Sequence, residues 1–448
     1  MLSRIKIVNL FGYLKHDIDF NSVVENVVIL HGPNGTGKTT IFKILESISN
    51  KEFDIFFNIP FDKLIVYFED GSSLEIINER SKFITFISSN SEHEPYQFQK
   101  RKISRRYIDT DNLDINIFNI LTNMGAHRVG NYTFEYKRRR YHYLDLCEVL
   151  GINLENLGIN KERKELPKWL QQTIKKLNVF YIDAERLITK NDSNNNIRKV
   201  NNYREKLMNI IANYETLYAV RSKELDATFP KRIIKIEKEK PVLGIDKYDI
   251  VNNLKVLSLI RNDISRRGIL SDKTADEILT VDEFKVDDIM DSDGLKQSLY
   301  TYIKDNFEKF SVMDELLNQI NLFEKIVNDF FHGKKLEVIR SQGYVIESTI
   351  GTLTGKEIPP IMLSSGEQHF LVLFFELIFN AKNKQLVLID EPEISLHVSW
   401  QVNMVDRLIE ISNLNNNKFV LATHSPSILR NHRDCVIPTG YDEDGNNE

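Results

Sequence analysis

The stretch His31-Gly32-Pro33-Asn34-Gly35-Thr36-Gly37-Lys38-Thr39-Thr40 directly follows the apolar run Val27–Leu30 and spells G-x-x-x-x-G-K-[ST]. Such a loop between a strand and a helix surrounds a phosphate with backbone N–H groups, and the helix directs its positive end at the anion. Lys38 would span the β- and γ-phosphates of a nucleotide, and Thr39 would hold Mg²⁺. A Gly-rich turn also occurs without a ligand, but here every specified position matches. We therefore predict nucleotide binding by Asn34, Gly35, Thr36, Gly37, Lys38, Thr39 and Thr40.

A second candidate site lies at Asp390-Glu391, which closes the apolar run 385–389. A continuous apolar run is typical of a buried parallel strand, and α/β sheets bind ligands at the carboxyl ends of such strands. Asp390 would reach the Mg²⁺ through its water shell, and Glu391 would deprotonate the water that attacks the γ-phosphate. An acidic pair at a strand end is common, so this prediction depends on its combination with the phosphate loop.

Two further motifs narrow the class of nucleotidase. Leu363-Ser364-Ser365-Gly366-Glu367-Gln368 precedes an expected helix at 369–380, and Thr423-His424-Ser425 follows an expected strand at 419–422. Taken alone, the serines could serve as a helix cap and His424 as an ordinary loop histidine. Four motifs in this order make a coincidence improbable.

The four motifs resemble those of ATP-binding-cassette heads, specifically the soluble branch of chromosome-maintenance, recombination and phage-defence ATPases. The resemblance implies an α/β fold with a two-lobed head, a mixed β-sheet that carries the phosphate loop, and an inserted α-helical domain. It implies that Ser364, Ser365 and Gly366 grip the γ-phosphate bound to the opposite protomer. Two chains would thus dimerise head to head around ATP and Mg²⁺. The resemblance also makes Glu391 and His424 the catalytic residues, with His424 contacting the same γ-phosphate.

The composition excludes several classes of protein. The 448 residues carry a net charge of −5, which gives no general attraction to nucleic acid. Cys147 and Cys435 lie far apart without metal-binding spacing, so we expect neither a disulfide framework nor a zinc or iron–sulfur site. No run approaches the ~18 apolar residues of a membrane span. The N-terminus also lacks the apolar segment of a signal peptide, so we expect a cytoplasmic protein without a membrane partner.

The motif spacing predicts how the domains are organised. More than 300 residues separate Lys38 from Ser364, so the head must be completed around a large insertion. We expect an N-terminal lobe with the phosphate loop at 1–100, an insertion at 101–334, a C-terminal lobe with the other motifs at 335–438, and an acidic tail at 439–448. The insertion would add a core strand at 179–183. Its helical subdomain at 198–330 lacks sustained heptads, which favours a compact helical protrusion over long coiled-coil arms.

Local patterns in the first lobe predict a β-rich region. Strands are expected at 5–10, 64–68 and 74–77, with a hairpin turn at Glu69–Ser72. After the phosphate loop, one buried helical face should carry the apolar residues that recur at helical spacing, Ile41, Ile44, Leu45 and Ile48.

Two basic runs, Lys100–Arg106 and Lys137–Arg140, are candidates for nucleic-acid contacts, and the second lies between Tyr136 and Tyr141. Basic runs flanked by aromatic residues can grip a phosphate backbone and stack bases. With a negative net charge, solvated surface segments are the favoured interpretation. Nucleic acid is therefore expected only through a larger complex.

Patches outside the nucleotide motifs resemble one subgroup, the ATPase subunits of the Septu anti-phage system, and the similar ATPases that accompany some retrons. These patches are Asn9–Tyr13, Tyr181–Leu187, Glu224–Arg232 and Glu391–His397 with Trp400-Gln401. Where the subgroup often shows Thr-Gln-Arg-Leu, this chain has Ala184-Glu185-Arg186-Leu187. The glutamine ligand of Mg²⁺ is therefore unassigned, with Gln97 and Gln99 as alternatives.

The resemblance also implies a partner. Related overcoming-lysogenisation-defect nucleases continue past the switch histidine into a nuclease domain, whereas 24 residues follow His424 here, fewer than the ~50 residues of a small domain. We expect an ATP-hydrolysing sensor and scaffold that controls a separate HNH-type nuclease subunit. The alternative is a RecF- or Rad50-like recombination or repair ATPase that binds DNA directly, and a third possibility is a nucleotide-gated scaffold with little turnover. Short helical arms and weak basic patches count against the RecF- or Rad50-like ATPase, and the intact Glu391 counts against the scaffold with little turnover.

Overall fold

The computed structural model describes residues 2–21, 26–79, 82–99, 166–185, 188–190, 196–238, 247–270 and 293–439, with short pieces between 118 and 150. The chain forms two compact units, Met1–Asp17 with Ser47–Leu177 (unit 1) and Ile18–Glu46 with Asn178–Glu448 (unit 2). Several features considered above lie outside the described residues: the basic run at 100–106, Lys137 and Arg138, Arg186 and Leu187, and the tail from residue 440 onward.

Unit 1 is built on a six-stranded sheet with the strand order β2-β1-β4-β5-β6-β7. The strands are β1 (Leu2–Leu10), β2 (Leu14–Asp19), β4 (Lys63–Phe68), β5 (Ser73–Glu79), β6 (Phe83–Ser88) and β7 (Tyr96–Gln99). Strands β1, β4, β5, β6 and β7 pair antiparallel in that order, and alternate side chains such as Leu64 and Val66 are buried. The three strands expected here are confirmed. So is the hairpin turn, in which the Ser72 N–H donates to the Asp70 carboxylate (3.1 Å) and Gly71 has a φ of 80°.

The other elements of unit 1 are short. They are η1 (Phe53–Phe57), β8 (His127–Arg128), β9 (Thr133–Tyr136), β10 (Arg139–His142) and α4 (Lys168–Lys175). Strands β10, β9 and β8 form a small sheet in that order. The aromatic side chains of η1 pack on the large sheet, where the ring centroids of Phe53 and Phe86 lie 4.7 Å apart.

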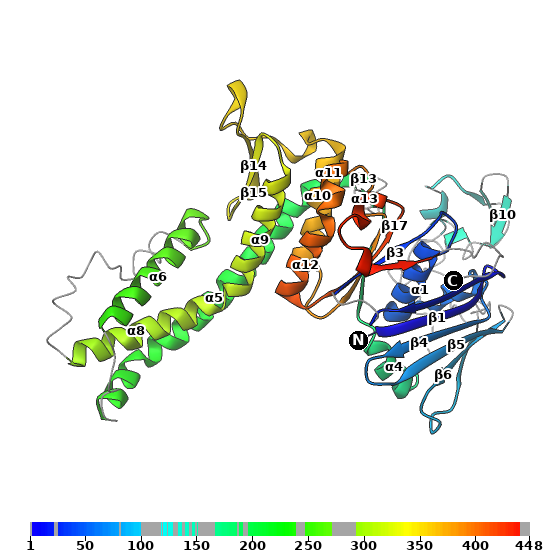
Figure 1. Ribbon diagram of the computed structural model, residues 1–448, viewed down its shortest axis with the longest axis horizontal. Helices are drawn as coiled ribbons and strands as arrows, with labels where there is room; N and C mark the ends of the chain where they lie inside the picture. Colours follow the sequence, from blue (N-terminus) through cyan, green and yellow to red (C-terminus); the bar gives the residue numbers. More distant parts are fainter. Residues whose placement is uncertain are drawn as a thin grey trace. The chain divides into compact units, whose positions relative to one another are not determined.

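Unit 2 contains a five-stranded sheet in the order β11-β16-β17-β3-β18, in which each pair of neighbours is parallel. The strands are β3 (Val27–His31), β11 (Val179–Ile182), β16 (Leu386–Asp390), β17 (Lys418–Thr423) and β18 (Val436–Pro438). Their register aligns Thr423 with His31 and Asp390 with Ala422. Because parallel strands all end at the same edge, the segments that follow β3, β11, β16 and β17 meet there (Figure 1). This is the α/β fold expected from the sequence, but the described sheet that carries the phosphate loop is parallel throughout and not mixed as expected, because the antiparallel pairs form separate sheets.

Helix α1 (Lys38–Asn50) follows the phosphate loop and buries the face that the sequence predicted. Ile41, Ile44, Leu45 and Ile48 are each 0% exposed. Burying four aliphatic side chains stabilises the helix by about 1.5–3 kcal/mol for each, which fixes the direction in which its N-terminus points.

Helix α10 (Ser365–Phe375) begins four residues before the start predicted at His369, and it continues as the π-helical turn η7 (Glu376–Asn380). A capping box explains the early start. The Ser364 side chain accepts a hydrogen bond from the Glu367 N–H, and the Glu367 carboxylate accepts one from the Ser364 N–H (2.9 Å). The serine motif is therefore part of the helix terminus itself.

The helical region of unit 2 consists of α5 (Lys199–Lys238), α6 (Lys247–Arg266), α8 (Asp293–Ser311) and α9 (Asp314–Phe330). Helix α5 has 40 residues and is therefore ~60 Å long at 1.5 Å per residue. A helix of this length is longer than the compact helical protrusion that the sequence predicted. Helix α8 packs along α5 (Figure 1), and ion pairs join Arg232 to Asp305 and Lys309 to Asp226. The packing of α8 along its side and these ion pairs stabilise α5, so the long helix does not need a coiled-coil partner with heptad repeats.

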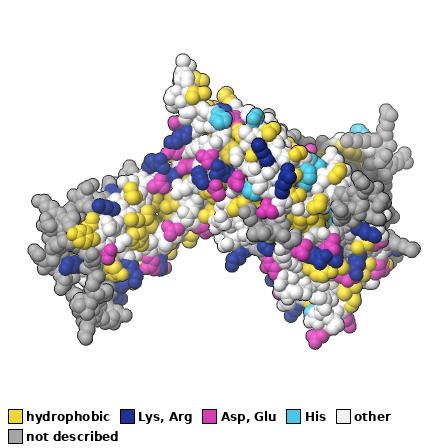
Figure 2. All heavy atoms as spheres, in the orientation of Figure 1, with side chains coloured by type: hydrophobic (Ala, Val, Ile, Leu, Met, Phe, Trp, Pro, Cys, Tyr) yellow, Lys and Arg dark blue, Asp and Glu magenta, His cyan; other side chains and the backbone are white. Residues whose placement is uncertain are grey.

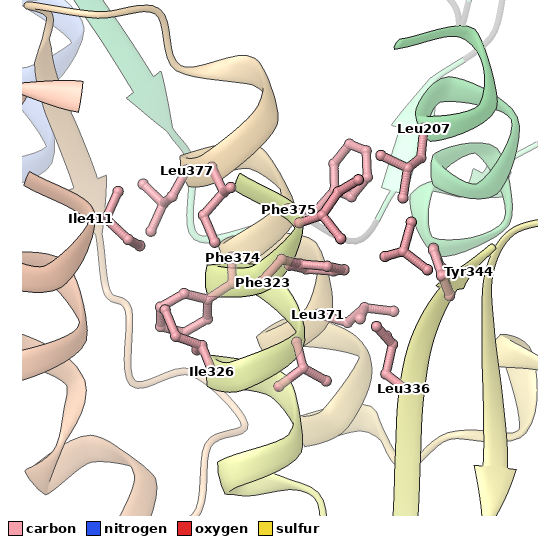
Figure 3. Packing of buried hydrophobic residues seen from close by; sticks show 14 of the residues in the cluster. Leu207, Phe323, Ile326, Leu336, Tyr344, Leu371, Phe374, Phe375, Leu377 and Ile411 are labelled. Atoms are coloured by element: carbon pink, nitrogen blue, oxygen red, sulfur yellow. The ribbon is translucent and has the colours of Figure 1, made fainter. Parts of the chain in front are cut away.

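The core of unit 2 joins this helical region to the rest of the unit. Figure 3 shows Leu207 of α5, Phe323 of α9 and Phe375 of α10 converging on Tyr344 and Leu336 of the hairpin formed by β15 (Gly343–Ser348) and β14 (Lys334–Ile339). The Tyr344 hydroxyl donates to the Val200 carbonyl of α5 (2.9 Å). The base of α5 is thus fixed by both apolar packing and hydrogen bonding.

The remaining described elements of unit 2 are β12 (Ile188–Lys190), β13 (Asn196–Arg198), η5 (Gly351–Leu353), η6 (Pro360–Met362), α11 (Val398–Val402), α12 (Met404–Asn415), α13 (Pro426–Leu429) and η8 (Arg433–Cys435). None of the helices among the described residues combines the length and the hydrophobicity that a membrane span requires.

The contact between α5 and the β14–β15 hairpin can be tested at Gly343. This residue has a φ of 74°, and a Cβ there would lie 2.2 Å from the Arg204 carbonyl oxygen. Gly343→Ala should destabilise the protein by about 3 kcal/mol or more, because backbone strain adds to a backbone clash. Gly355→Ala is the matched control, since Gly355 has a φ of 78° and open space around its Cα. It should cost only about 1–2 kcal/mol. Equal losses of stability in thermal melts would show that the clash contributes nothing.

Candidate functional site

The phosphate loop lies in unit 2, between β3 and α1, and its backbone requires glycine at several positions. Gly35 and Gly37 have φ values of 85° and 83°, in the left-handed region that glycine tolerates best. A Cβ on Gly32 would lie 1.7 Å from the Thr439 carbonyl oxygen. Thr439 lies at the start of the tail predicted from the sequence, yet it is 2% exposed and donates its N–H to the His31 carbonyl (2.7 Å). Thr439, the residue that follows β18, therefore braces the loop.

The ammonium group of Lys38 is directed into the loop. Its Nζ donates to the carbonyls of Gly32 (2.8 Å) and Pro33 (2.9 Å) and to the Thr36 hydroxyl (3.2 Å). The residue is 5% exposed, and burial lowers the pKa of Lys38, while the charges of Asp390, Glu391 and Glu393 oppose that shift. One cation and three carboxylates thus share this edge of the sheet.

Asp390 and Thr39 form a pair at the same edge. The Thr39 hydroxyl donates to Asp390 Oδ1 (3.1 Å), and the Tyr181 hydroxyl lies 3.4 Å from Oδ2. Burial raises the pKa of Asp390, and the Thr39 hydrogen bond opposes this shift. Tyr181 comes from β11, so the insertion supplies a wall of the site.

The residue after Asp390 has an uncommon backbone conformation. Glu391 has a φ of 43°, and its N–H donates to the Ala422 carbonyl of β17 (2.8 Å). Non-glycine residues rarely adopt positive φ, and such strain is found preferentially at functional sites. Among the described residues, the Glu391 carboxylate has no hydrogen-bond or ion-pair partner, so it is available to a ligand.

His424 follows β17 and is held by a residue that the sequence analysis did not single out. The Glu393 carboxylate accepts hydrogen bonds from the His424 N–H (2.8 Å) and from the Thr423 hydroxyl (2.7 Å). A carboxylate two positions beyond Glu391 was visible in the sequence, but no local spacing links it to a loop 30 residues away.

The serine motif lies at the N-terminus of α10. Ser364 and Ser365 are exposed. Gly366 packs closely on the turn that follows β16, where a Cβ on Gly366 would lie 2.5 Å from the Ser395 carbonyl oxygen. Burial opposes the ionisation of Glu367, but hydrogen bonds from Lys334 and Ser364 hold the pKa of Glu367 below its ordinary value. Within the described part of the chain, no hydrogen bond or ion pair joins this motif to the phosphate loop.

The structure therefore brings together some of the predicted residues. The phosphate loop (Asn34, Gly35, Thr36, Gly37, Lys38, Thr39 and Thr40), Asp390, Glu391 and His424 lie at the carboxyl edge of the parallel sheet. Ser364, Ser365 and Gly366 lie at the separate terminus of α10. Of the alternatives for the glutamine ligand, Gln97 and Gln99 lie in β7 of unit 1, and Ala184 and Glu185 follow β11.

The donor set at this edge fits a nucleotide with Mg²⁺. Mg²⁺ prefers oxygen ligands and is usually held by one or two carboxylates together with substrate phosphates. The Thr39 hydroxyl and the Asp390 carboxylate supply such oxygens side by side. The three donors of Lys38 already converge on acceptors inside the loop, which is the arrangement that a phosphate group would use.

Comparisons with known proteins identify a family and give two similar solved structures. The family model described as "AAA ATPase domain" matches residues 1–429. The chain is similar to a solved structure of the Smc head domain with an extended coiled coil, bound to the C-terminal domain of ScpA, derived from Pyrococcus furiosus. The identity is 15% and the TM-score 0.37, with 100% of this chain and 95% of that chain covered. It is also similar to an Smc head bound to the C-winged helix domain of ScpA, at 12% identity and a TM-score of 0.35, covering 100% and 96%. No curated protein matches the chain.

The role of Lys38 can be tested by nucleotide titration. Lys38→Ala should weaken ATP binding about tenfold to a hundredfold, because hydrogen bonds to a charged group contribute about 1.5–3 kcal/mol. Isothermal titration calorimetry with ATP and Mg²⁺ measures the affinity. The matched control is Lys43→Ala, which removes the same charge from the exposed face of α1 and should bind ATP normally. An unchanged affinity for Lys38→Ala would contradict the assignment of the phosphate loop.

Proposed function

The chain belongs to the AAA ATPase domain family, and from this premise we propose that it binds ATP with Mg²⁺ and hydrolyses the ATP to ADP and phosphate. The observation that carries the proposal is the meeting of Lys38, Thr39 and Asp390 at one edge of the parallel sheet. Glu391 follows directly and has a strained backbone and a carboxylate available to a ligand. A cation for phosphate, oxygens for a metal ion and a base for water are the groups that phosphoryl transfer to water requires.

Each residue has a role that follows from its chemistry. Lys38 would exchange the neutral acceptors of the loop for the β- and γ-phosphates, which are stronger acceptors because they are charged. Thr39 and Asp390 would hold Mg²⁺, which neutralises phosphate charge when it is bound. Glu391 would take a proton from the attacking water. His424 would contact the γ-phosphate from the end of β17.

Glu391 separates hydrolysis from binding. Glu391→Gln keeps the size of the side chain but removes the base, so turnover should fall about 10²- to 10⁴-fold while ATP affinity is retained. Phosphate release measures turnover, and calorimetry measures affinity. Glu410→Gln, in α12 of the same unit and paired with Lys325, is the control. If Glu391→Gln hydrolyses ATP as fast as the parent, the base must be another residue.

We further propose that the chain acts as a homodimer with ATP between the two heads. Ser364 and Ser365 are exposed at a helix N-terminus, where the N–H groups and the helix dipole attract an anion. Apolar side chains near this terminus are also exposed. Ile361 and Met362 precede it in the sequence and are 50% and 74% exposed, and Val398, which follows the turn packed on Gly366, is 58% exposed. Exposed apolar side chains beside an anion-binding terminus suit an interface that forms around a partner's nucleotide.

Mixed dimers test whether the sites are shared. Ser364→Arg should block the interface by bulk and charge, and Lys38→Ala should weaken nucleotide binding, so each variant alone should lose most of its activity at an ATP concentration that saturates only the parent. Mixing them should restore one working site in each heterodimer, because each chain supplies what the other lacks. The measurements are ATPase activity and native mass spectrometry. Verified heterodimers without activity would argue against sites built from two chains.

At the level of biology, we propose a sensor and scaffold subunit of an anti-phage defence complex that controls a separate HNH-type nuclease. The sequence patches that resemble Septu ATPases support this role. The docking surface would lie on the helical region at 203–330. There α5 exposes Leu217 and Val220 (54% each), and α6 exposes Leu259 (70%). Figure 2 shows hydrophobic side chains mixed with charged ones along these helices, as is usual for interfaces that form and dissociate.

The second candidate is a RecF- or Rad50-like ATPase that binds DNA directly. The 40-residue length of α5 favours it, because a long helical arm suits a protein that reaches along or around a duplex. Direct DNA binding by the purified chain, weakening with salt as phosphate contacts require, would support this candidate over the defence role.

Reconstitution separates these functions. The purified protein should hydrolyse ATP yet leave DNA and RNA uncut with Mg²⁺ or Mn²⁺, and cutting should appear when the nuclease subunit purified with it from the same operon is added. ATP occupancy would control the output through the head dimer. Leu217→Lys with Leu259→Lys should abolish partner binding, whereas Lys43→Ala should not. If the isolated chain cuts nucleic acid, and mutations in this chain abolish the cutting, the two-subunit proposal is refuted.

A further inference from the structure

Glu393 has a buried carboxylate oxygen without a partner. Its Oε1 accepts from the Thr423 hydroxyl (2.7 Å) and the His424 N–H (2.8 Å), whereas Oε2 is buried and makes no hydrogen bond within the described part of the protein. Buried polar atoms are nearly always hydrogen-bonded, and an unsatisfied one costs stability. Glu393 therefore keeps one oxygen bonded while the other is left unsatisfied, so the two hydrogen bonds that Oε1 accepts call for a functional explanation.

The turn that carries Glu393 is constrained from both ends. Glu391 and Ser395 have φ values of 43° and 62°, and the Ser395 carbonyl lies so close to Gly366 that a Cβ there would lie 2.5 Å from its oxygen. The Glu391 N–H is bonded to Ala422 of β17. The carboxylate of Glu393 is therefore presented by a rigid turn rather than by a flexible loop.

The segment after β17 depends on this turn for its placement. Besides the two bonds to Glu393, the Ser425 hydroxyl donates to the side-chain oxygen of Gln401 (2.6 Å), and the Gln401 amide donates to the Leu396 carbonyl (2.9 Å). The backbone N–H of His424 has Glu393 as its acceptor, so that carboxylate holds the backbone from which the imidazole extends.

We propose that Glu393 is a positioning residue for the reaction: its Oε1 fixes the backbone at Thr423 and His424 relative to Glu391, so that the histidine and the base face the same phosphate. This inference rests on the proposed ATP hydrolysis. In this proposal Glu393 contacts the protein backbone and the Thr423 hydroxyl, and it has no direct role on the substrate. It acts through His424, and what matters is a side-chain oxygen that can accept the hydrogen bonds of the Thr423 hydroxyl and the His424 N–H.

Three variants test this role. Glu393→Ala removes the acceptor, and Glu393→Asp withdraws it by one methylene while it keeps the charge. Both should lower kcat about tenfold or more and change KM for ATP less than about threefold, since transition-state contacts are lost and ground-state binding is kept. Glu393→Gln keeps an amide oxygen with two lone pairs at the same reach, so it should restore kcat to within about threefold of the parent. Glu410→Ala, which removes a half-buried carboxylate paired with Lys325 and Arg407 in α12, is the matched control.

Hydrogen exchange gives a readout that does not depend on turnover. The amide of His424 should exchange faster in Glu393→Ala and Glu393→Asp than in the parent, and Glu393→Gln should protect it. If Glu393→Ala does not fold, Glu393→Asp carries the test. Parental kcat and protection in Glu393→Asp would overturn the proposal, and so would a Glu393→Gln variant as inactive as Glu393→Ala, because charge would then be the operative property. A parent that does not hydrolyse ATP would refute the proposed function instead, and the exchange data would still decide whether Glu393 holds His424.

Discussion

The parallel pairing of β16, β17 and β3 is the constraint on which the candidate site depends. It places Thr39 within 3.1 Å of Asp390 although 351 positions separate them. Each strand is an almost continuous apolar run, so burial of the strands between flanking helices drives their association. The register then fixes which residues face the edge, since a slip of one residue would turn alternate side chains to the opposite face. The site is thus a consequence of core packing.

Charge at the sheet edge is balanced in a way that suits an anionic ligand. Lys38 is 5% exposed and satisfies its three donors with two carbonyls and a hydroxyl, all neutral groups. The nearby carboxylates of Asp390, Glu391 and Glu393 oppose the effect of burial on its pKa. A phosphate is a charged acceptor and offers Lys38 a stronger interaction than the carbonyls do. The carboxylates alone would repel the phosphate, so a cation such as Mg²⁺ is needed to bring the two together.

The sequence was sufficient for those parts of the fold and the candidate site that local spacing encodes. The burial of Ile41 and Leu45 follows from helical periodicity, and the strands β11, β16 and β17 follow from apolar runs. The serines are a possible helix cap in the sequence and Ser364 and Glu367 have the spacing of a capping box, yet the predicted start at His369 lies four residues after the observed one. The contact of Glu393 with the His424 backbone could not be foreseen, since it joins two strand ends through tertiary structure. The length of α5 was also missed, because lateral packing on α8 replaces the heptad pattern.

The N-terminus of α10, which carries the serine motif, and the base of α5 are connected through one packed core. Helix α10 begins at the serine motif and ends at Phe375. The carboxylate of the next residue, Glu376, accepts hydrogen bonds from the Tyr203 hydroxyl of α5 and from the Asn380 amide. The ring of Tyr203 stacks on Phe375, with centroids 4.2 Å apart and an interplanar angle of 7°. A core packed at this density does not deform gradually, so α5 cannot tilt at its base without breaking this stack or moving α10. The π-helical turn after Phe375 is where the pattern of helix hydrogen bonds changes, directly beside this stack.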